Sequence, residues 1–204
     1  MAKINIDKKT GVLSLIILLL VATIAAMAIG SDQHNGLPEM HRGGMHQDDE
    51  SSSSTLSGAD VMFLQMMIPH HQQAIDISEL AITTSKNAEL VALATAIRDG
   101  QASEIVQMKN WLVQVGADIE MGHMGHDMGG MLTDAELSTL KSSKGSVFDR
   151  LWLEGMTNHH NGALHMTTMI SDAQNPEIKQ FGQKIIEVQS AQNAQMKTML
   201  SRLG

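Results

Sequence analysis

Apolar residues recur every three or four positions along most of the chain from residue 60 onward, which places them on one face of a helix. The first such stretch predicts a helix over about 60–84, with Phe63 and Ile77 on its apolar face. The second predicts a helix that Asn87 caps at its start and Gly116 ends. Together these two segments predict a helical hairpin.

Three further helices are predicted in the second half of the chain. The sequence TDAE at residues 133–136 is a capping box for one short helix that ends near Ser142. A long helix is expected after Gly145, and Asn175 with Pro176 supplies the N-cap and first turn of a final helix. The expected fold class is therefore all-α.

An internal repeat relates the two halves. A shift of 89 residues places MMIPHHQQAI, which contains His70, on GMTNHHNGAL, which contains His159, and a shift of 88 places QMKNWL on QMKTML. Two copies of one hairpin, each with one apolar stripe, can bury those stripes against each other. The repeat predicts an antiparallel four-helix bundle with approximate two-fold symmetry, made of two repeated helical hairpins plus a short connecting helix. The two His-His pairs should then occupy matching positions.

The chain before residue 58 lacks this pattern. Lysines precede 18 mostly apolar residues, Val12–Ile29, which predicts a cleaved signal peptide or a retained N-terminal membrane anchor over 1–30. Residues 31–57 are rich in Ser, Met and His and predict a flexible linker. We therefore expect a helical bundle domain at 58–204, outside the cytoplasm in the periplasm or at the cell surface.

Composition restricts the chemistry of any site. The 204 residues include 17 Met and 10 His but no Cys, and the formal net charge is -8. This charge argues against a nucleic acid partner, which would need a clustered basic surface. Without cysteine, a soft metal would have to be held by thioether sulfur or imidazole nitrogen. This donor set indicates copper, with Cu(I) favoured and Ag(I) or Cu(II) as further candidates.

Residues four apart on a helix share a face, so each repeat offers sulfur beside imidazole, as with Met67 and His71. Gly155 and Gly162 flank His159 by one turn, which predicts open space there for an imidazole or an ion. A buried or surface histidine with a purely structural role is the alternative for each pair taken alone. The candidate metal ligands on the helices are Met66, Met67, His70, His71, Met156, His159, His160, His165, Met166 and Met169.

A second group of candidate ligands lies in the glycine-rich segment MGHMGHDMGGM, residues 121–131, which predicts a mobile loop. With the similar linker sequence MHRGGMH, it has the composition of a metal-capturing arm, and incidental low-complexity composition is the alternative. The candidates in the loop are Met121, His123, Met124, His126, Met128 and Met131.

Gln101 and Glu104 lie on the apolar stripe of the second helix, where an unpaired polar group would be costly to bury. We expect them to form hydrogen bonds to the histidine nitrogens that do not face the metal. A simple polar contact between helices is the alternative, and for Gln189 and Gln192 the two interpretations are equally open.

The segments FLQMMIPHHQQAIDIS, IRDGQASEIVQMKNWL and MTNHHNGALHM resemble the bacterial proteins with domain of unknown function 305 over about residues 58–203. This resemblance implies a ferritin-like helical bundle, export from the cytoplasm, and copper binding and tolerance. Asn158 stands where the first repeat has Pro69, and His165 where it has Asp76. The residues that match the family pattern are Met67, His70, His71, Gln101, Glu104, Met108, Met156, His159, His160 and Met166.

The leading functional hypothesis is an extracytoplasmic copper-binding protein that buffers or traffics copper, without a catalytic residue. Its expected partners are copper ions and another copper-handling protein, with membrane contact only through the N-terminal segment. The alternatives are a copper-dependent redox enzyme and a structural or interaction module without metal. Di-iron chemistry is disfavoured because the one Glu-x-x-His sequence, Glu120 to His123, lies in the glycine-rich loop without a counterpart.

Overall fold

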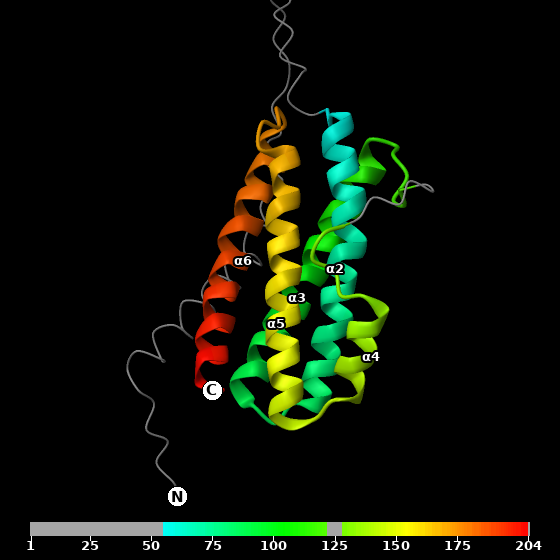
Figure 1. Cartoon of the computed structure of the whole chain (residues 1–204). Coiled ribbons are helices and arrows are strands. Elements are labelled where there is room, and N and C mark those ends of the chain that lie inside the picture. Colours follow the sequence, from blue (N-terminus) through cyan, green and yellow to red (C-terminus); the bar gives the residue numbers. More distant parts are fainter. Residues whose placement is uncertain (1–54, 122–127, 204) are drawn as a thin grey trace, which may run out of the picture. The chain divides into compact units, whose positions relative to one another are not determined.

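The computed structural model describes residues 55–121 and 128–203, and the regular structure in these residues is helical (Figure 1). Helix α2 packs against α3 and α5 against α6, which gives two hairpins, and contacts between α2 and α5 join them. The all-α prediction of two packed hairpins with a short connecting helix is confirmed. The elements are α2 (Gly58–Thr84), α3 (Ala88–Gln114), α4 (Asp134–Ser142), α5 (Gly145–Met166), the 3-10 helix η1 (Thr167–Ile170) and α6 (Pro176–Arg202).

The ends of these helices follow from local capping chemistry. The Asn87 side chain accepts hydrogen bonds from the backbone at the start of α3, and Asn175 does the same for α6. Thr133 and Glu136 form the predicted capping box of α4. Gly116 follows α3 with a φ of 69°, a left-handed conformation that glycine adopts without steric cost.

Helix α2 begins two residues earlier than predicted, because Ser57 and Asp60 form a further capping box in front of Gly58. Pro69 lies within this helix on its exposed side, and α2 continues past it to the histidines that follow. Helix α2 is therefore continuous through Pro69, and the turn that follows the proline faces the core.

The apolar core consists of two clusters. The first cluster includes Phe63, Met67, Ile105, Met108, Ala163, Met166, Phe181 and Ile185. The second cluster includes Ile77, Leu93, Ile97, Trp152, Met156, Met196 and Met199. Along α2 and α6 the first cluster precedes the second, whereas along α3 and α5 the order is reversed. This order shows that the two helices of each hairpin run antiparallel, whereas α3 and α5 run in the same direction.

Polar side chains lie between the two clusters on the inner side of all four long helices. We call this group the histidine layer, and it consists of His70, His71, Gln101, Glu104, His159, His160, Gln189 and Gln192. Each helix of the bundle contributes two of these residues, at the point where its apolar stripe passes from one cluster to the other. The fold thus buries a polar layer within an otherwise apolar core.

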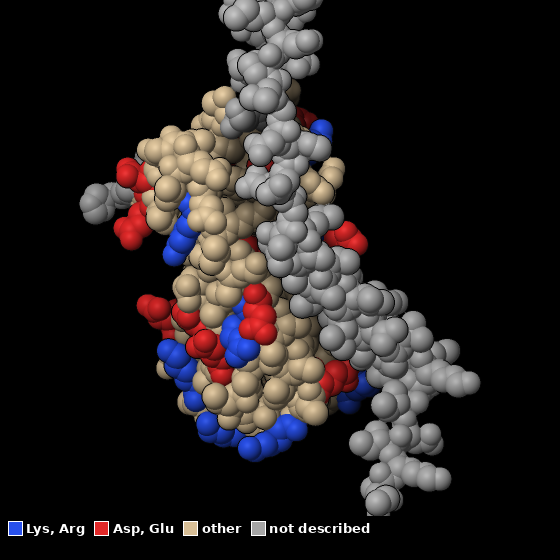
Figure 2. Space-filling model, turned by 180° about the vertical axis from the view of Figure 1, so that it is seen from behind, with Lys and Arg blue, Asp and Glu red and all other residues tan. Residues whose placement is uncertain are grey.

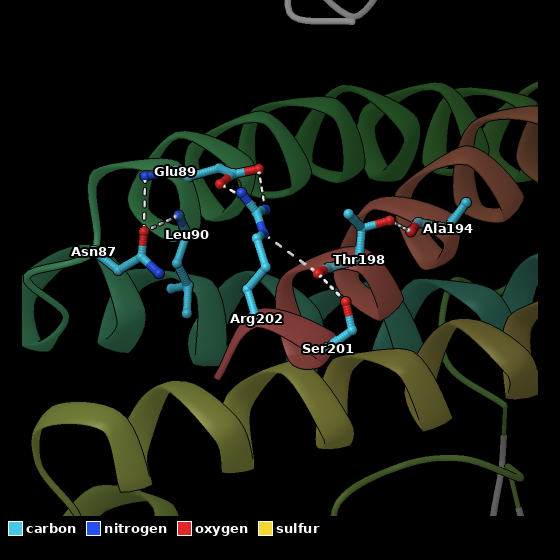
Figure 3. A network of polar contacts seen from close by, with 7 residues as sticks. All are labelled: Asn87, Glu89, Leu90, Ala194, Thr198, Ser201 and Arg202. Carbon is cyan, nitrogen blue, oxygen red and sulfur yellow. Dashed lines mark hydrogen bonds and ion pairs between the residues drawn. The ribbon is translucent and has the colours of Figure 1, made fainter. Parts of the chain in front are cut away.

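Polar contacts also fasten the two hairpins near the ends of the helices. The Arg202 guanidinium donates to both carboxylate oxygens of Glu89, at 2.8 and 2.9 Å, and so holds the end of α6 against the start of α3 (Figure 3). The Ser85 hydroxyl donates to Asp149 Oδ1 at 2.7 Å, in a buried contact between the end of α2 and α5. These contacts link the hairpins at one end, away from the histidine layer.

The predicted export segment 1–30 and most of the linker 31–57 lie outside the described residues. None of the helices within the described residues is long and apolar enough to cross a membrane.

On the face shown in Figure 2, Lys and Arg side chains lie among Asp and Glu side chains. The described part of this face therefore carries charges of both signs, with several Lys and Arg side chains gathered at its lower end.

Candidate metal centre

Four histidines from α2 and α5 are buried at the centre of the bundle. His70, His71, His159 and His160 each have 0% exposure to solvent. The ring centroids of His70 and His159 are 3.8 Å apart, with an angle of 41° between the ring planes. The structure thus brings together the two histidine pairs that the internal repeat places in matching positions.

The hydrogen bond to Glu104 fixes the tautomer of His71. His71 Nε2 lies 2.7 Å from Glu104 Oε2, and a carboxylate oxygen only accepts hydrogen bonds. Nε2 must therefore carry the proton, and in the neutral ring Nδ1 has a free lone pair. Such a nitrogen can bind a metal ion.

Two other histidines are held in the same way by different acceptors. His160 Nε2 donates to Gln192 Oε1 at 2.7 Å, and His70 Nε2 donates to the backbone oxygen of Gly129 at 3.3 Å. In three of the four rings, therefore, Nε2 is used for orientation and Nδ1 is left as a lone-pair donor.

None of these Nδ1 atoms has a hydrogen-bond partner in the described part of the chain, and neither nitrogen of His159 has one. A buried polar atom without a partner costs about 1–3 kcal/mol. Five unpaired ring nitrogens in one layer would together oppose folding substantially. A bound cation would satisfy lone pairs that the protein leaves unused, so this donor set fits a metal ion.

Burial also keeps these rings neutral. Burial, followed by repulsion from a charged His71, lowers the pKa of His70 to about 3, although the hydrogen bond to Gly129 acts in the opposite direction. Burial lowers the pKa of His160 to about 4, although the hydrogen bond to Gln192 acts in the opposite direction. For His159, burial is the main cause, and repulsion from the other three histidines adds to it, so the pKa lies well below its ordinary value. A contact with the His70 backbone opposes this shift, although its geometry is not that of a hydrogen bond. At neutral pH these lone pairs are therefore available.

The glutamine and glutamate residues of the layer are related by the 88-residue shift, which places Gln189 on Gln101 and Gln192 on Glu104. Glu104 forms the expected hydrogen bond to a histidine, whereas both amide atoms of buried Gln101 are unpaired. For Gln192 the sequence leaves a hydrogen bond to a histidine and a simple contact between helices equally open, and in the structure it orients His160 as Glu104 orients His71. The repeat alignment was the signal that identifies it.

Thioether side chains flank the layer on both sides. Met67 and Met156 are fully buried. Met67 lies one helical turn before His71 on the same face of α2, and Met156 lies one turn before His160 on the same face of α5. Met67 belongs to the first cluster and Met156 to the second. Soft sulfur is therefore present on each side of the imidazoles.

Two more of the predicted ligands, Met66 and Met166, are buried in the first cluster at 8% and 5% exposure. Within residues 55–121 and 128–203, no three His, Asp or Glu side chains gather closely enough to hold a metal ion by themselves. A site in the layer therefore requires methionine sulfur or few nitrogen ligands, which suits a soft monovalent ion better than a hard divalent one.

The prediction of open space beside Gly155 and Gly162 is wrong. A Cβ atom at Gly162 would lie 1.8 Å from the Gly129 backbone oxygen, and one at Gly155 would lie 3.1 Å from the Leu132 side chain. The end of the 121–131 loop and the residue after it fill this space, because the two glycines allow their close approach to α5.

The end of the loop is also tied to α2. The Gln73 side chain donates to the Leu132 backbone oxygen at 2.9 Å and accepts from its backbone nitrogen at 2.8 Å. Met121 and Met128 are half-buried against the first cluster, and Met131 is half-buried. The other predicted loop ligands, His123, Met124 and His126, lie outside the described residues.

His165 and Met169 do not join the buried group. His165 is exposed on α5, and Met169 is half-buried in the 3-10 helix η1. Because α5 ends at Met166, α-helical spacing does not extend from His165 to Met169.

Comparison with known proteins identifies relatives of the whole bundle. A family model described as a domain of unknown function, DUF305, matches residues 60–200. A crystal structure of a candidate secreted DUF305 protein from Streptomyces coelicolor is 29% identical, covers 72% of this chain and 94% of its own, and has a TM-score of 0.68. A DUF305 fragment from Deinococcus radiodurans is 28% identical, with coverage of 72% and 98% and a TM-score of 0.66.

A third similar protein is CopM. Its Cu(II)-bound form is 34% identical to this chain, covers 71% of it and 97% of its own chain, and has a TM-score of 0.62. Its Cu(I)-bound form has a TM-score of 0.60 at 32% identity, with coverage of 70% and 96%, and silver-bound forms of CopM are also similar. No curated protein matches this chain.

Proposed function

This chain belongs to the DUF305 family, and on that premise we propose that it is an extracytoplasmic copper-binding protein that buffers copper or passes it on. The observation that carries the proposal is the buried histidine layer, in which three rings are oriented through Nε2 while their Nδ1 lone pairs are unpaired. The likeness to CopM, which binds copper and silver, supports the same ligand class.

The donors in the layer favour Cu(I). Thioether sulfur and neutral imidazole are soft, uncharged ligands, and Cu(I) and Ag(I) accept few of them. Nitrogen ligands would come from among His70, His71, His159 and His160, and sulfur ligands from Met67 and Met156. Cu(II) binds imidazole equally well, so it remains a second ligand of the same site.

The donor set does not match the di-iron centres of other four-helix bundles. Those centres use four carboxylates and two histidines, whereas Glu104 is the single carboxylate of the histidine layer. The balance of imidazole over carboxylate therefore supports a copper carrier rather than an iron oxidase.

We assign residues 1–30 to export or membrane anchoring and residues 31–57 to a linker that carries the bundle outside the cytoplasm. The apolar segment Val12–Ile29 supports the first assignment, and the candidate secreted relative supports export.

Titration of the full chain with Cu(I) against a competing chelator tests this function. Replacing His71 and His160 with alanine is expected to weaken the tightest site by about tenfold or more, because each residue removes an oriented nitrogen. Changing exposed His165 to alanine is the matched control and should leave that affinity unchanged. Equal affinities in the double variant and the wild type would contradict a site in the layer.

A further inference from the structure

The two halves of the histidine layer are built alike except for one charge. The His71 ring donates from Nε2 to Glu104 at 2.7 Å, and the His160 ring donates from Nε2 to Gln192 at 2.7 Å. The internal repeat aligns these two pairs, so the same hydrogen bond is made once to a carboxylate and once to an amide. The orientation of the two rings is therefore conserved between the halves, while the charge behind each ring differs.

We infer that Glu104 sets an oxidation-state preference: the Nδ1 atom of His71, whose ring donates to a carboxylate, favours Cu(II), and the Nδ1 atom of His160, whose ring donates to an amide, favours Cu(I). This inference rests on the proposed copper-binding function. Glu104 would act on a bound ion only through the His71 ring, so it is a positioning and charge-setting residue rather than a ligand.

The electrostatic reason is that a fixed negative charge stabilises a doubly charged ion more than a singly charged one. Glu104 is the one carboxylate of the layer, and its side chain is only 13% exposed, so water screens it weakly. A unit charge about 7 Å away at an effective dielectric constant of about 20 changes the ratio of the two affinities by a factor on the order of ten to fifty.

The hydrogen bond contributes in the same direction. A carboxylate that accepts from imidazole Nε2 raises electron density on the ring and makes Nδ1 a stronger donor than an amide acceptor does. An electron-rich nitrogen stabilises the higher oxidation state. At Gln192 both contributions are smaller, which leaves the His160 nitrogen closer to neutral thioether and imidazole chemistry.

The test compares isosteric exchanges in the full chain. The variant E104Q retains an oxygen that can accept from His71 but removes the charge, and Q192E adds a charge while retaining an acceptor for His160. Affinities for Cu(I) and for Cu(II) are each measured by competition with a chelator. E104Q should lower the ratio of Cu(II) affinity to Cu(I) affinity by about tenfold, which raises the midpoint potential by about 59 mV, and Q192E should do the reverse.

The double exchange E104Q/Q192E is the matched control, because it restores the total charge and should return the ratio close to that of the wild type. A purely structural role would instead weaken both oxidation states together in every variant. Wild-type ratios in both single variants would overturn the inference while leaving copper binding intact. Copper affinity that does not respond to loss of His71 and His160 would overturn the proposed function and this inference with it.

Discussion

At the scale of single residues, His159 shows most clearly that the histidine layer is not there for stability. Its ring is fully buried and neither nitrogen has a hydrogen-bond partner in the described part of the chain. An aliphatic side chain of similar volume would fill the same space without the cost of about 1–3 kcal/mol for each unpaired polar atom. A ligand that uses these nitrogens accounts for this arrangement.

The buried rings make the stability of the metal-free protein depend on pH. The pKa values of His70 and His160 fall from 6.5 to about 3 and about 4 on folding. The unfolded chain therefore binds protons below pH 6.5 that the folded chain cannot bind. The free energy of unfolding therefore has its full value above pH 6.5. It decreases as the pH falls towards 4, by up to about 1.4 kcal/mol per pH unit for each ring.

Thermal unfolding of the metal-free full chain between pH 7.5 and 5 measures this effect, and we expect the midpoint to fall steadily below pH 6.5. A His70→Gln variant should show a shallower dependence, because it removes one such ring. An unchanged midpoint across this range would show that the rings are accessible to protons in the folded state.

At the scale of elements, the close approach of the loop to α5 should control access to the layer. Gly162→Ala places a Cβ atom 1.8 Å from the Gly129 backbone oxygen, so the loop end must move. Because Gly129 also accepts the hydrogen bond from His70, this movement should uncover that ring. We expect a loss of about 1–3 kcal/mol in unfolding free energy and faster modification of buried histidines by diethyl pyrocarbonate.

Gly100→Ala is the control for this substitution. It also adds a methyl group within a helix, but nothing lies within 4 Å of the new atom. We expect it to stabilise α3 by about 0.5–1 kcal/mol and to leave histidine modification unchanged. If diethyl pyrocarbonate modified the histidines of both glycine variants at the same rate, the loop would not cover the layer.

The sequence predicts these elements well where the determinants are local. Asn87, the Thr133 capping box and the Asn175 cap each satisfy backbone groups within three residues, so their effect can be read without tertiary structure. The filling of the space beside Gly162 depends on residues some thirty positions earlier in the chain. No local pattern specifies that contact, and glycine alone is compatible with either an open or a filled space.

At the scale of the whole molecule, the internal repeat predicts both the bundle and the meeting of the histidine pairs. The repeat does not require its two copies to be chemically equal, and the exchange of Glu104 for Gln192 shows that they are not. The division of the core into two apolar clusters becomes apparent only when all four helices are aligned. Each cluster stabilises one end of the bundle, which allows the layer between them to serve binding.

The central claim is that the buried histidines present unprotonated Nδ1 atoms to a soft metal ion. Long-range proton–nitrogen NMR spectra of the histidine rings in the full chain test it most directly, before and after addition of Ag(I) as a diamagnetic probe. We predict that His70, His71 and His160 are Nε2-protonated tautomers at neutral pH, and that Ag(I) shifts Nδ1 resonances of the buried rings. Ag(I) binding that shifts only exposed His165 and the histidines outside the described residues would contradict the account.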